Sequence, residues 1–128
     1  MKVLKFGGTS VGSAKNIQKV IEIVKNESLS ENVSVVVSAI GGITDRLLAA
    51  ADKAVQKNKK YKVDFESIRL KHIEVIDGLL SEEAHQTTLD IVLNHLSKLE
   101  KILDGIYLIN EMSPKTTDKL LSFGELLS

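Results

Sequence analysis

The stretch Val3–Lys15, "VLKFGGTSVGSAK", decides the fold, because a short apolar run ends in a glycine pair and a helix can start soon after it. Lys2–Phe6 has the pattern of a β-strand, which the Gly7-Gly8 pair breaks. Ser13 is the predicted N-cap of a helix whose apolar residues recur at helical spacing: Ile17, Val20, Ile21 and Val24. Val33–Ala39 is β-branched and almost continuously apolar, which is typical of a strand buried on both faces. Strand, helix and strand in this order predict a βαβ unit of an α/β sheet.

The glycines in this stretch raise the question of a phosphate-binding loop. A P-loop would place Lys-Ser or Lys-Thr directly after its last glycine. Here Ser13 and Ala14 separate Gly12 from Lys15, so the P-loop is excluded. The lysine close to the glycine pair is Lys5, which precedes it on the predicted strand.

The first candidate site consists of Lys5 and the loop residues Gly7, Gly8, Thr9 and Ser10. In an open α/β sheet, ligands bind beyond the carboxyl ends of the strands, where this loop is expected. Glycines let a phosphate approach backbone N–H groups, and the start of the next helix adds a favourable dipole. A lysine there could neutralise charge that develops in phosphoryl transfer. On the residues alone, an ordinary glycine turn beside a solvent-facing lysine explains the pattern equally well.

Two further groups could face the same ligand. Ser38, Gly41, Gly42 and Thr44 again form a strand end, a glycine turn and a helix start, and parallel strands would bring them beside the first loop. Thr44 is the predicted helix cap, and its hydroxyl could also face a small ligand. The third group is Glu125 in "SFGEL", which either faces solvent or pairs with an amine of a ligand.

The rest of the chain is predicted to be helical. They are predicted from Thr44 to Val55, from Phe65 to Leu80, from about Glu82 to Ile109 and from Ser113-Pro114 onward. Leucines and other apolar residues of the third of these follow a heptad seam. The seam favours an intrachain hairpin with the preceding helix over an intermolecular zipper. His72 lies on an apolar stripe and is expected to be a hydrogen-bonded core residue.

Composition excludes several classes of function. The 128 residues make one domain, and 17 Lys+Arg balance 17 Asp+Glu, so no net field favours nucleic acid or anionic lipid. The five aromatic residues (three Phe and two Tyr) are too few for base-stacking platforms. No apolar run approaches a membrane span, and the absence of cysteine excludes disulfides and agrees with the cytoplasm. The three histidines are too far apart in sequence to suggest a metal site.

Three blocks in order, "KFGGTSVG", "VVVSAIGGITDRLL" and "LLSFGELLS", closely resemble the aspartokinases of the amino-acid kinase superfamily along the whole chain. The first residues and the stretch "ILDGIYLINEMSPKTTDKLLSFGELLS" resemble most the bifunctional aspartokinase–homoserine dehydrogenases. The resemblance implies a helix-rich α/β structure. It would be the N-terminal portion of a carbamate-kinase-like, three-layer αβα fold that starts with βαβ and includes a helical hairpin.

The activity implied by the resemblance is phosphorylation of the side-chain carboxylate of L-aspartate by MgATP, which gives 4-phospho-L-aspartate. This product leads to lysine, threonine and methionine. By match to the family motifs, Lys5 would be catalytic, because it would stabilise the phosphoryl group in transfer. Gly7 and Gly8 would offer N–H groups to the ATP phosphates, and Thr9 and Ser10 would line the same loop.

The same resemblance implies an aspartate site. Ser38 and Thr44 would contact the aspartate, and Glu125 would meet its ammonium group through a charge-assisted hydrogen bond. No residue of this chain is assigned to a metal. NADP would belong only to the dehydrogenase part of a bifunctional enzyme.

Residues 1–128 are therefore expected to form the first, incomplete part of an aspartokinase catalytic domain, without ACT or dehydrogenase domains. The chain alone is expected to be inactive, to bind ATP poorly and to form homo-oligomers by strand pairing or helix exchange. Two alternatives stay open. One is another amino-acid kinase, for example of glutamate, and the other is a non-catalytic interaction module built on the helix pair Phe65–Ile109.

Overall fold

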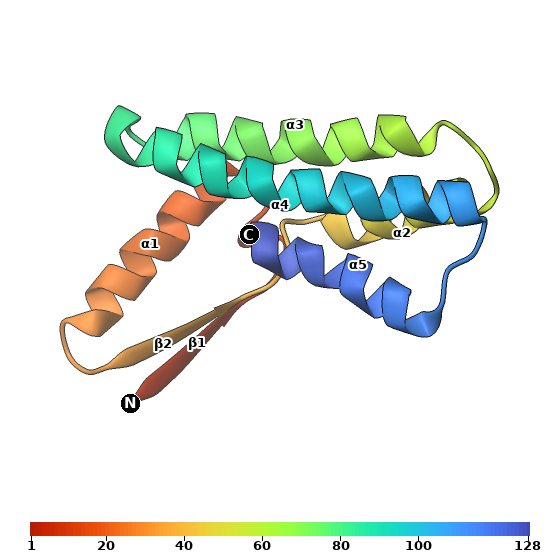
Figure 1. The fold of residues 1–128 in the computed structure, drawn as a ribbon. Helices are drawn as coiled ribbons and strands as arrows, with labels where there is room; N and C mark the ends of the chain where they lie inside the picture. Colours follow the sequence, from red (N-terminus) through yellow and green to blue (C-terminus); the bar gives the residue numbers. More distant parts are fainter.

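The computed structural model describes all 128 residues and contains two strands and five helices (Figure 1). Their order along the chain is β1 (Lys2–Phe6), α1 (Ala14–Ser28), β2 (Val33–Val37), α2 (Ile43–Val55), α3 (Tyr61–Leu79), α4 (Glu82–Ile109) and α5 (Pro114–Leu127). The predicted helix-rich α/β class is confirmed. Figure 1 shows the strands with α1 on one side of the molecule and the other four helices gathered beside the carboxyl ends of the strands.

The predicted βαβ unit is present. β1 and β2 pair in parallel, with Lys2 opposite Val33 and Phe6 opposite Val37, and α1 forms the crossover between them. Ser13 caps α1 as expected, because its hydroxyl accepts a hydrogen bond of 3.1 Å from the Asn16 N–H. Such a cap stabilises a helix by about 1 kcal/mol.

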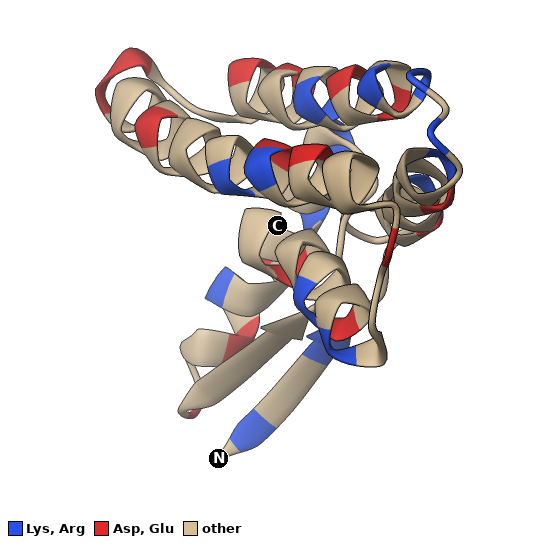
Figure 2. Ribbon diagram, turned by 45° about the vertical axis from the view of Figure 1, so that its right-hand side comes forward, with Lys and Arg blue, Asp and Glu red and all other residues tan.

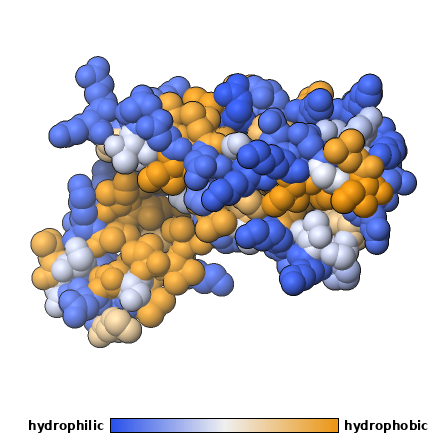
Figure 3. All heavy atoms as spheres, in the orientation of Figure 1, coloured by the Kyte–Doolittle hydropathy of each residue, from blue (hydrophilic) through white to orange (hydrophobic).

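The prediction that the second strand is buried on both faces is wrong. Val35, Val36 and Val37 are 43%, 48% and 36% exposed. The sheet has two strands, and α1 is the helix that packs against β2, so much of the apolar strand surface meets no other element. Figure 3 shows this as an apolar surface over the strands and α1, beside a hollow that separates them from the bundle.

The hydrophobic core lies among α2, α3, α4 and α5, together with the residues between β2 and α2. The heptad residues of α4 all face this core, which confirms an intrachain hairpin: Val92, Leu96, Leu99, Leu103 and Ile106. Burial of each leucine contributes about 1.5–3 kcal/mol. Tyr61 ties α3 to α4, because its hydroxyl donates to an Asp104 carboxylate oxygen at 2.6 Å. None of the helices is long and apolar enough to cross a membrane.

The other two predicted helix caps had different outcomes, and α3 begins at Tyr61, four residues before the predicted start at Phe65. Ser113 caps α5, with its hydroxyl 3.1 Å from the Thr116 N–H and Pro114 as first helical residue, as predicted. Thr44 does not cap α2. The N-cap is Gly42, which has φ of 84°, and Thr44 lies in the first turn of a helix that begins at Ile43. Glycine adopts this left-handed conformation without a steric penalty, so the chain turns one residue before the helix and two before Thr44.

His72 is the one buried polar residue of the core, as predicted from its place on the apolar stripe. Its Nδ1 lies 2.7 Å from the carbonyl oxygen of Ile68, and its Nε2 has no partner. Burial lowers the pKa of His72 below the ordinary value of 6.5, and the nearby cations Arg46 and Lys71 lower it further. The folded chain therefore favours the neutral imidazole.

This burial predicts a pH dependence of stability. Between pH 6.5 and the lowered pKa of the folded chain, the unfolded chain binds more protons at this position than the folded chain, so the free energy of unfolding decreases as the pH falls, by up to about 1.4 kcal/mol per pH unit. Urea denaturation followed by circular dichroism between neutral and mildly acidic pH measures this slope. His72→Leu should flatten it, whereas the control His95→Leu, at a less buried histidine, should leave it in place. Equal slopes in the wild type and in His72→Leu would contradict the expectation.

Candidate functional site

Two glycine loops meet where the strands end. We call Gly7–Gly12 the first glycine loop and Ser38–Gly42 the second glycine loop. The Gly41 N–H donates a hydrogen bond of 3.1 Å to the Gly8 carbonyl, and the Ser38 N–H donates to the Phe6 carbonyl at the same distance. A methyl group on Gly41 would lie 2.9 Å from the Gly8 oxygen, and one on Gly8 would lie 3.2 Å from the Gly41 Cα. The two backbones therefore touch, and the contact excludes a side chain at Gly41 and leaves little room for one at Gly8.

The first glycine loop is fixed by its own buried residue Val11 and by a hydrogen bond from α1. Its Val11 side chain is buried, and the Val11 N–H donates to the Gly7 carbonyl at 3.2 Å. The Asn16 amide of α1 donates to the Thr9 carbonyl at 3.0 Å. Thr9 and Ser10 are exposed on the outer side of the loop. The loop is thus fixed in shape while its hydroxyl groups remain accessible.

The backbone N–H groups of this loop are the feature that could bind an anion. Those of Gly7, Gly8, Thr9 and Ser10 donate to no acceptor within the chain. Four adjacent free donors at the carboxyl end of a strand, directly before a helix, match the requirements of a phosphate group. The sequence predicted that the glycines would open the backbone to a phosphate group, and the structure shows that the N–H groups there are unpaired.

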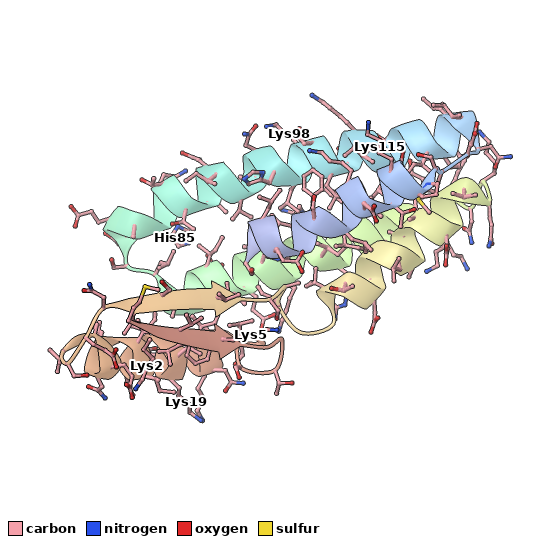
Figure 4. All side chains as sticks on the ribbon, turned by 90° about the horizontal axis from the view of Figure 1, so that it is seen from below. Lys2, Lys5, Lys19, His85, Lys98 and Lys115 are labelled. Carbon is pink, nitrogen blue, oxygen red and sulfur yellow. The ribbon has the colours of Figure 1, made fainter.

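Lys5 is the cation next to these donors. It is exposed, is the last residue but one of β1, and makes no hydrogen bond or ion pair within the chain. Lys2 at the other end of the same strand pairs with Glu27 at 2.5 Å. Figure 4 shows Lys5 near the strand end and the neighbouring loop, and Lys2 toward the opposite end. The two lysines of one strand therefore differ in whether their charge is already neutralised.

The third candidate residue, Glu125, lies near the second glycine loop because α5 packs against this loop. Gly124 is buried against it, since a methyl group there would lie 2.9 Å from the Ala39 Cβ and 3.9 Å from the Thr44 hydroxyl oxygen. Glu125 is the next residue and is exposed, without a partner within the chain. Ser38 is half-buried, and its hydroxyl donates to the Ala39 carbonyl at 2.9 Å. The structure thus brings the segments of all three groups together, the first two directly and the third through Gly124.

Sequence reasoning missed two residues beside the first glycine loop. Asn16 and Lys19 of α1 line a cavity of about 320 Å³ together with Thr9 and Ser10. Asn16 lies three residues after the helix cap, and nothing in its sequence context distinguishes it from any polar residue of a first turn. No group of His, Cys, Asp and Glu side chains in the structure could hold a metal ion.

The fold and this edge define an α/β protein with a glycine-rich strand end whose backbone N–H groups are unpaired. All of the chain, residues 1–128, matches the family model described as "Amino acid kinase family", and the chain belongs to this family. The resemblance to aspartokinases is confirmed by curated relatives. Aspartokinase 1, chloroplastic, of Arabidopsis thaliana is 34% identical over 98% of this chain, and the aspartokinase of Candida albicans is 35% identical over the same share. The bifunctional aspartokinase/homoserine dehydrogenase 2, chloroplastic, of Arabidopsis thaliana is 33% identical.

Solved structures of an aspartokinase are also similar to this chain. The crystal structure of Escherichia coli aspartokinase III in complex with aspartate and ADP superposes with a TM-score of 0.82 at 29% identity, over 99% of this chain and 26% of that one. Its complex with lysine and aspartate gives a TM-score of 0.83. The chain spans 21%, 24% and 14% of the lengths of the three curated relatives. It thus matches the N-terminal part of the aspartokinase fold and about a fifth of the relatives' length.

The contact between the two loops generates a testable prediction. Gly41→Ala places a methyl group 2.9 Å from a backbone oxygen that cannot move aside cheaply, so the free energy of unfolding should fall by about 1–3 kcal/mol. Urea denaturation measures the change. Gly105→Ala is the matched control, since nothing lies within 4 Å of a methyl group there. In the helix interior that change should raise stability by up to about 1 kcal/mol. Equal effects of the two substitutions would show that the loops do not touch.

Proposed function

We propose that this chain forms the first part of an aspartokinase catalytic domain, which transfers the γ-phosphoryl group of ATP to the side-chain carboxylate of L-aspartate and yields 4-phospho-L-aspartate. The observation that carries the proposal is the first glycine loop, where Lys5 adjoins four backbone N–H groups without acceptors. The chain spans about a fifth of the length of this relative. We therefore propose the activity for the whole protein and not for the 128 residues alone.

Binding of the ATP phosphates would use these donors. Gly7 and Gly8 leave room for phosphate oxygens to approach the backbone, and Thr9 and Ser10 add hydroxyl donors on the exposed side. Lys5 would stabilise the charge that grows on the phosphoryl oxygens during transfer. Phosphoryl transfer asks mainly for positioning and charge neutralisation, which a rigid loop and a lysine can supply. Mg²⁺ would arrive bound to the nucleotide.

The aspartate would lie on the other side of the transferred group. Ser38 and Thr44 belong to the second glycine loop and to the helix that follows it, and Glu125 comes from α5 next to the buried Gly124. A carboxylate there can accept a charge-assisted hydrogen bond from the substrate's ammonium group. Support for aspartate over glutamate comes from the relatives, since aspartokinase III was crystallised with aspartate.

The chain by itself should not turn over substrate. Its exposed first loop offers phosphate contacts from one side only, so ATP should bind weakly and water should not be excluded from the reacting groups. A coupled assay of ADP release on the purified 128-residue chain should give no aspartate-dependent rate. A clear aspartate-dependent rate would contradict this part of the proposal.

The role of Lys5 can be tested in the complete gene product. Lys5→Met should lower kcat at least about a hundredfold, because it removes a charge that acts on the transition state. Lys2→Met is the matched control, since it changes the same residue type on the same strand, at the end away from the loops, and should keep kcat. Full turnover in Lys5→Met would overturn the assignment. If Lys5→Met impairs assembly but each assembled enzyme keeps its turnover, Lys5 acts in assembly and not in catalysis. That result would favour the alternative in which this chain is a non-catalytic interaction module.

A further inference from the structure

Four consecutive carbonyl groups at the end of β1 and in the first glycine loop each accept a hydrogen bond from a backbone N–H. The carbonyls belong to Phe6, Gly7, Gly8 and Thr9, and they accept at 3.1 to 3.2 Å from the N–H groups of Ser38, Val11, Gly41 and Gly12. No peptide bond of the chain is cis. In a planar trans peptide, the carbonyl of one residue and the N–H of the next point in opposite directions. The four bonds therefore turn the next four N–H groups away from the groups that hold the carbonyls, and these are the donors without acceptors: Gly7, Gly8, Thr9 and Ser10.

One of the four carbonyls is also held by a side chain. The Thr9 carbonyl accepts the Gly12 N–H at 3.2 Å and the Asn16 side-chain amide at 3.0 Å. No other side chain of the protein donates to any of the four. The backbone donors are present whatever the side chains are, so Asn16 is the residue whose identity influences the orientation of this loop.

Asn16 is itself well placed for this contact. It lies in the first turn of α1, and its own N–H donates to the Ser13 hydroxyl oxygen at 3.1 Å. Its side chain borders the cavity of about 320 Å³ together with Thr9 and Ser10. The amide thus reaches the loop from a capped helix, which is a more rigid support than another loop would be.

We propose that Asn16 is a positioning residue of the first glycine loop, which holds the Thr9–Ser10 peptide so that the Ser10 N–H is directed toward a phosphate group of the nucleotide. The inference rests on the proposed function, because it adds a residue to the proposed phosphate site. Asn16 acts through the peptide and does not bind the phosphate itself. Without its amide, the Thr9 carbonyl keeps only the bond from Gly12, three residues away, and the peptide is freer to rotate.

A neutral donor suits the surroundings of this site. Residues 1–21 contain no Asp or Glu, and in Figure 2 the charged residues of β1 are all basic. An ionised carboxylate at residue 16 could not donate to the Thr9 carbonyl and would repel a phosphate group. The amide orients the peptide without adding such a charge.

Steady-state kinetics of the complete gene product test this role. Asn16→Leu keeps a side chain of similar size but removes the donor. It should raise the KM for ATP about three- to tenfold, which corresponds to one net hydrogen bond, and leave kcat and the KM for aspartate within about twofold. Asn16→Gln keeps the donor on a longer side chain and should restore part of the loss. Asn26→Leu, at an exposed residue of the same helix, is the matched control and should behave as the wild type.

NMR spectroscopy of the 128-residue chain, titrated with inorganic tripolyphosphate, follows each donor separately. In the wild type, the amide signals of all four donors should shift. In Asn16→Leu, the Ser10 amide should shift much less, whereas those of Gly7 and Gly8 should keep their response. An equal reduction at all four amides would indicate a general loss of structure and would overturn the inference.

The possible outcomes separate this inference from the proposed function. If Asn16→Leu keeps the KM for ATP while Lys5→Met loses turnover, the role of Asn16 is wrong and the proposed function stands. A lower kcat together with higher KM values for both substrates would also contradict a positioning role toward ATP. Full turnover in Lys5→Met, or no amide shift in the wild type, would overturn the proposed phosphate site and this inference with it.

Discussion

The contact between the Gly8 carbonyl and the Gly41 N–H is the interaction on which the rest of the structure depends. It extends the pairing of β1 and β2 past the ends of the strands, and it brings the two backbones so close that no side chain fits at Gly41 and only a tight one would fit at Gly8. A single hydrogen bond adds only about 0.5–1.5 kcal/mol to stability, so its importance is geometric. It fixes where the chain leaves each strand, toward α1 from the first and toward α2 from the second. Because α2 carries part of the buried core, the same contact joins the small sheet to the helical bundle.

The last helix completes this junction. Gly124 of α5 has no side chain, so the helix packs against Ala39 at a distance that a methyl group would not permit. Phe123 and Leu127 are buried on either side of it, and their burial holds α5 in place. The carboxyl end of α5 thereby lies near the carboxyl ends of the strands, as Figure 1 shows. The segments that carry residues 5, 44 and 125, which are far apart in sequence, come together through the contact of Gly8 with Gly41 and the packing of Gly124 against Ala39, and not through direct bonds between their side chains.

The sequence was sufficient where structure depends on neighbours along the chain. Ser13 and Ser113 were correct as helix caps, because a cap bonds to an N–H only three residues away, and the bounds of α4 followed from its heptad pattern. The predictions failed where the outcome depends on distant packing or on a choice between equivalent local solutions. The apolar run of β2 predicted burial, yet burial requires covering elements, which no local pattern specifies. Gly42 and Thr44 were both acceptable as the start of α2, and only the backbone conformation decides between them. The glycine loops were predicted, but the proximity of Gly124 to Ala39 and the role of Asn16 follow from tertiary contacts alone.

The first glycine loop has a feature that stabilises nothing within this chain. Backbone N–H groups nearly always find a partner when buried, so four adjacent unpaired donors are tolerated only because water reaches them. Lys5 adds a positive charge at the strand end that leads into this loop, and no carboxylate of the chain pairs with it, although Glu27 pairs with Lys2 on the same strand. Positive charge beside positive dipole ends is electrostatically unfavourable without an anion and becomes favourable with one. The loop therefore carries an electrostatic cost in the free chain that an anion would relieve. This cost in the free chain is the physical reason for which we propose the loop, and not the larger cavities among the helices, as the place of the phosphate groups of a nucleotide.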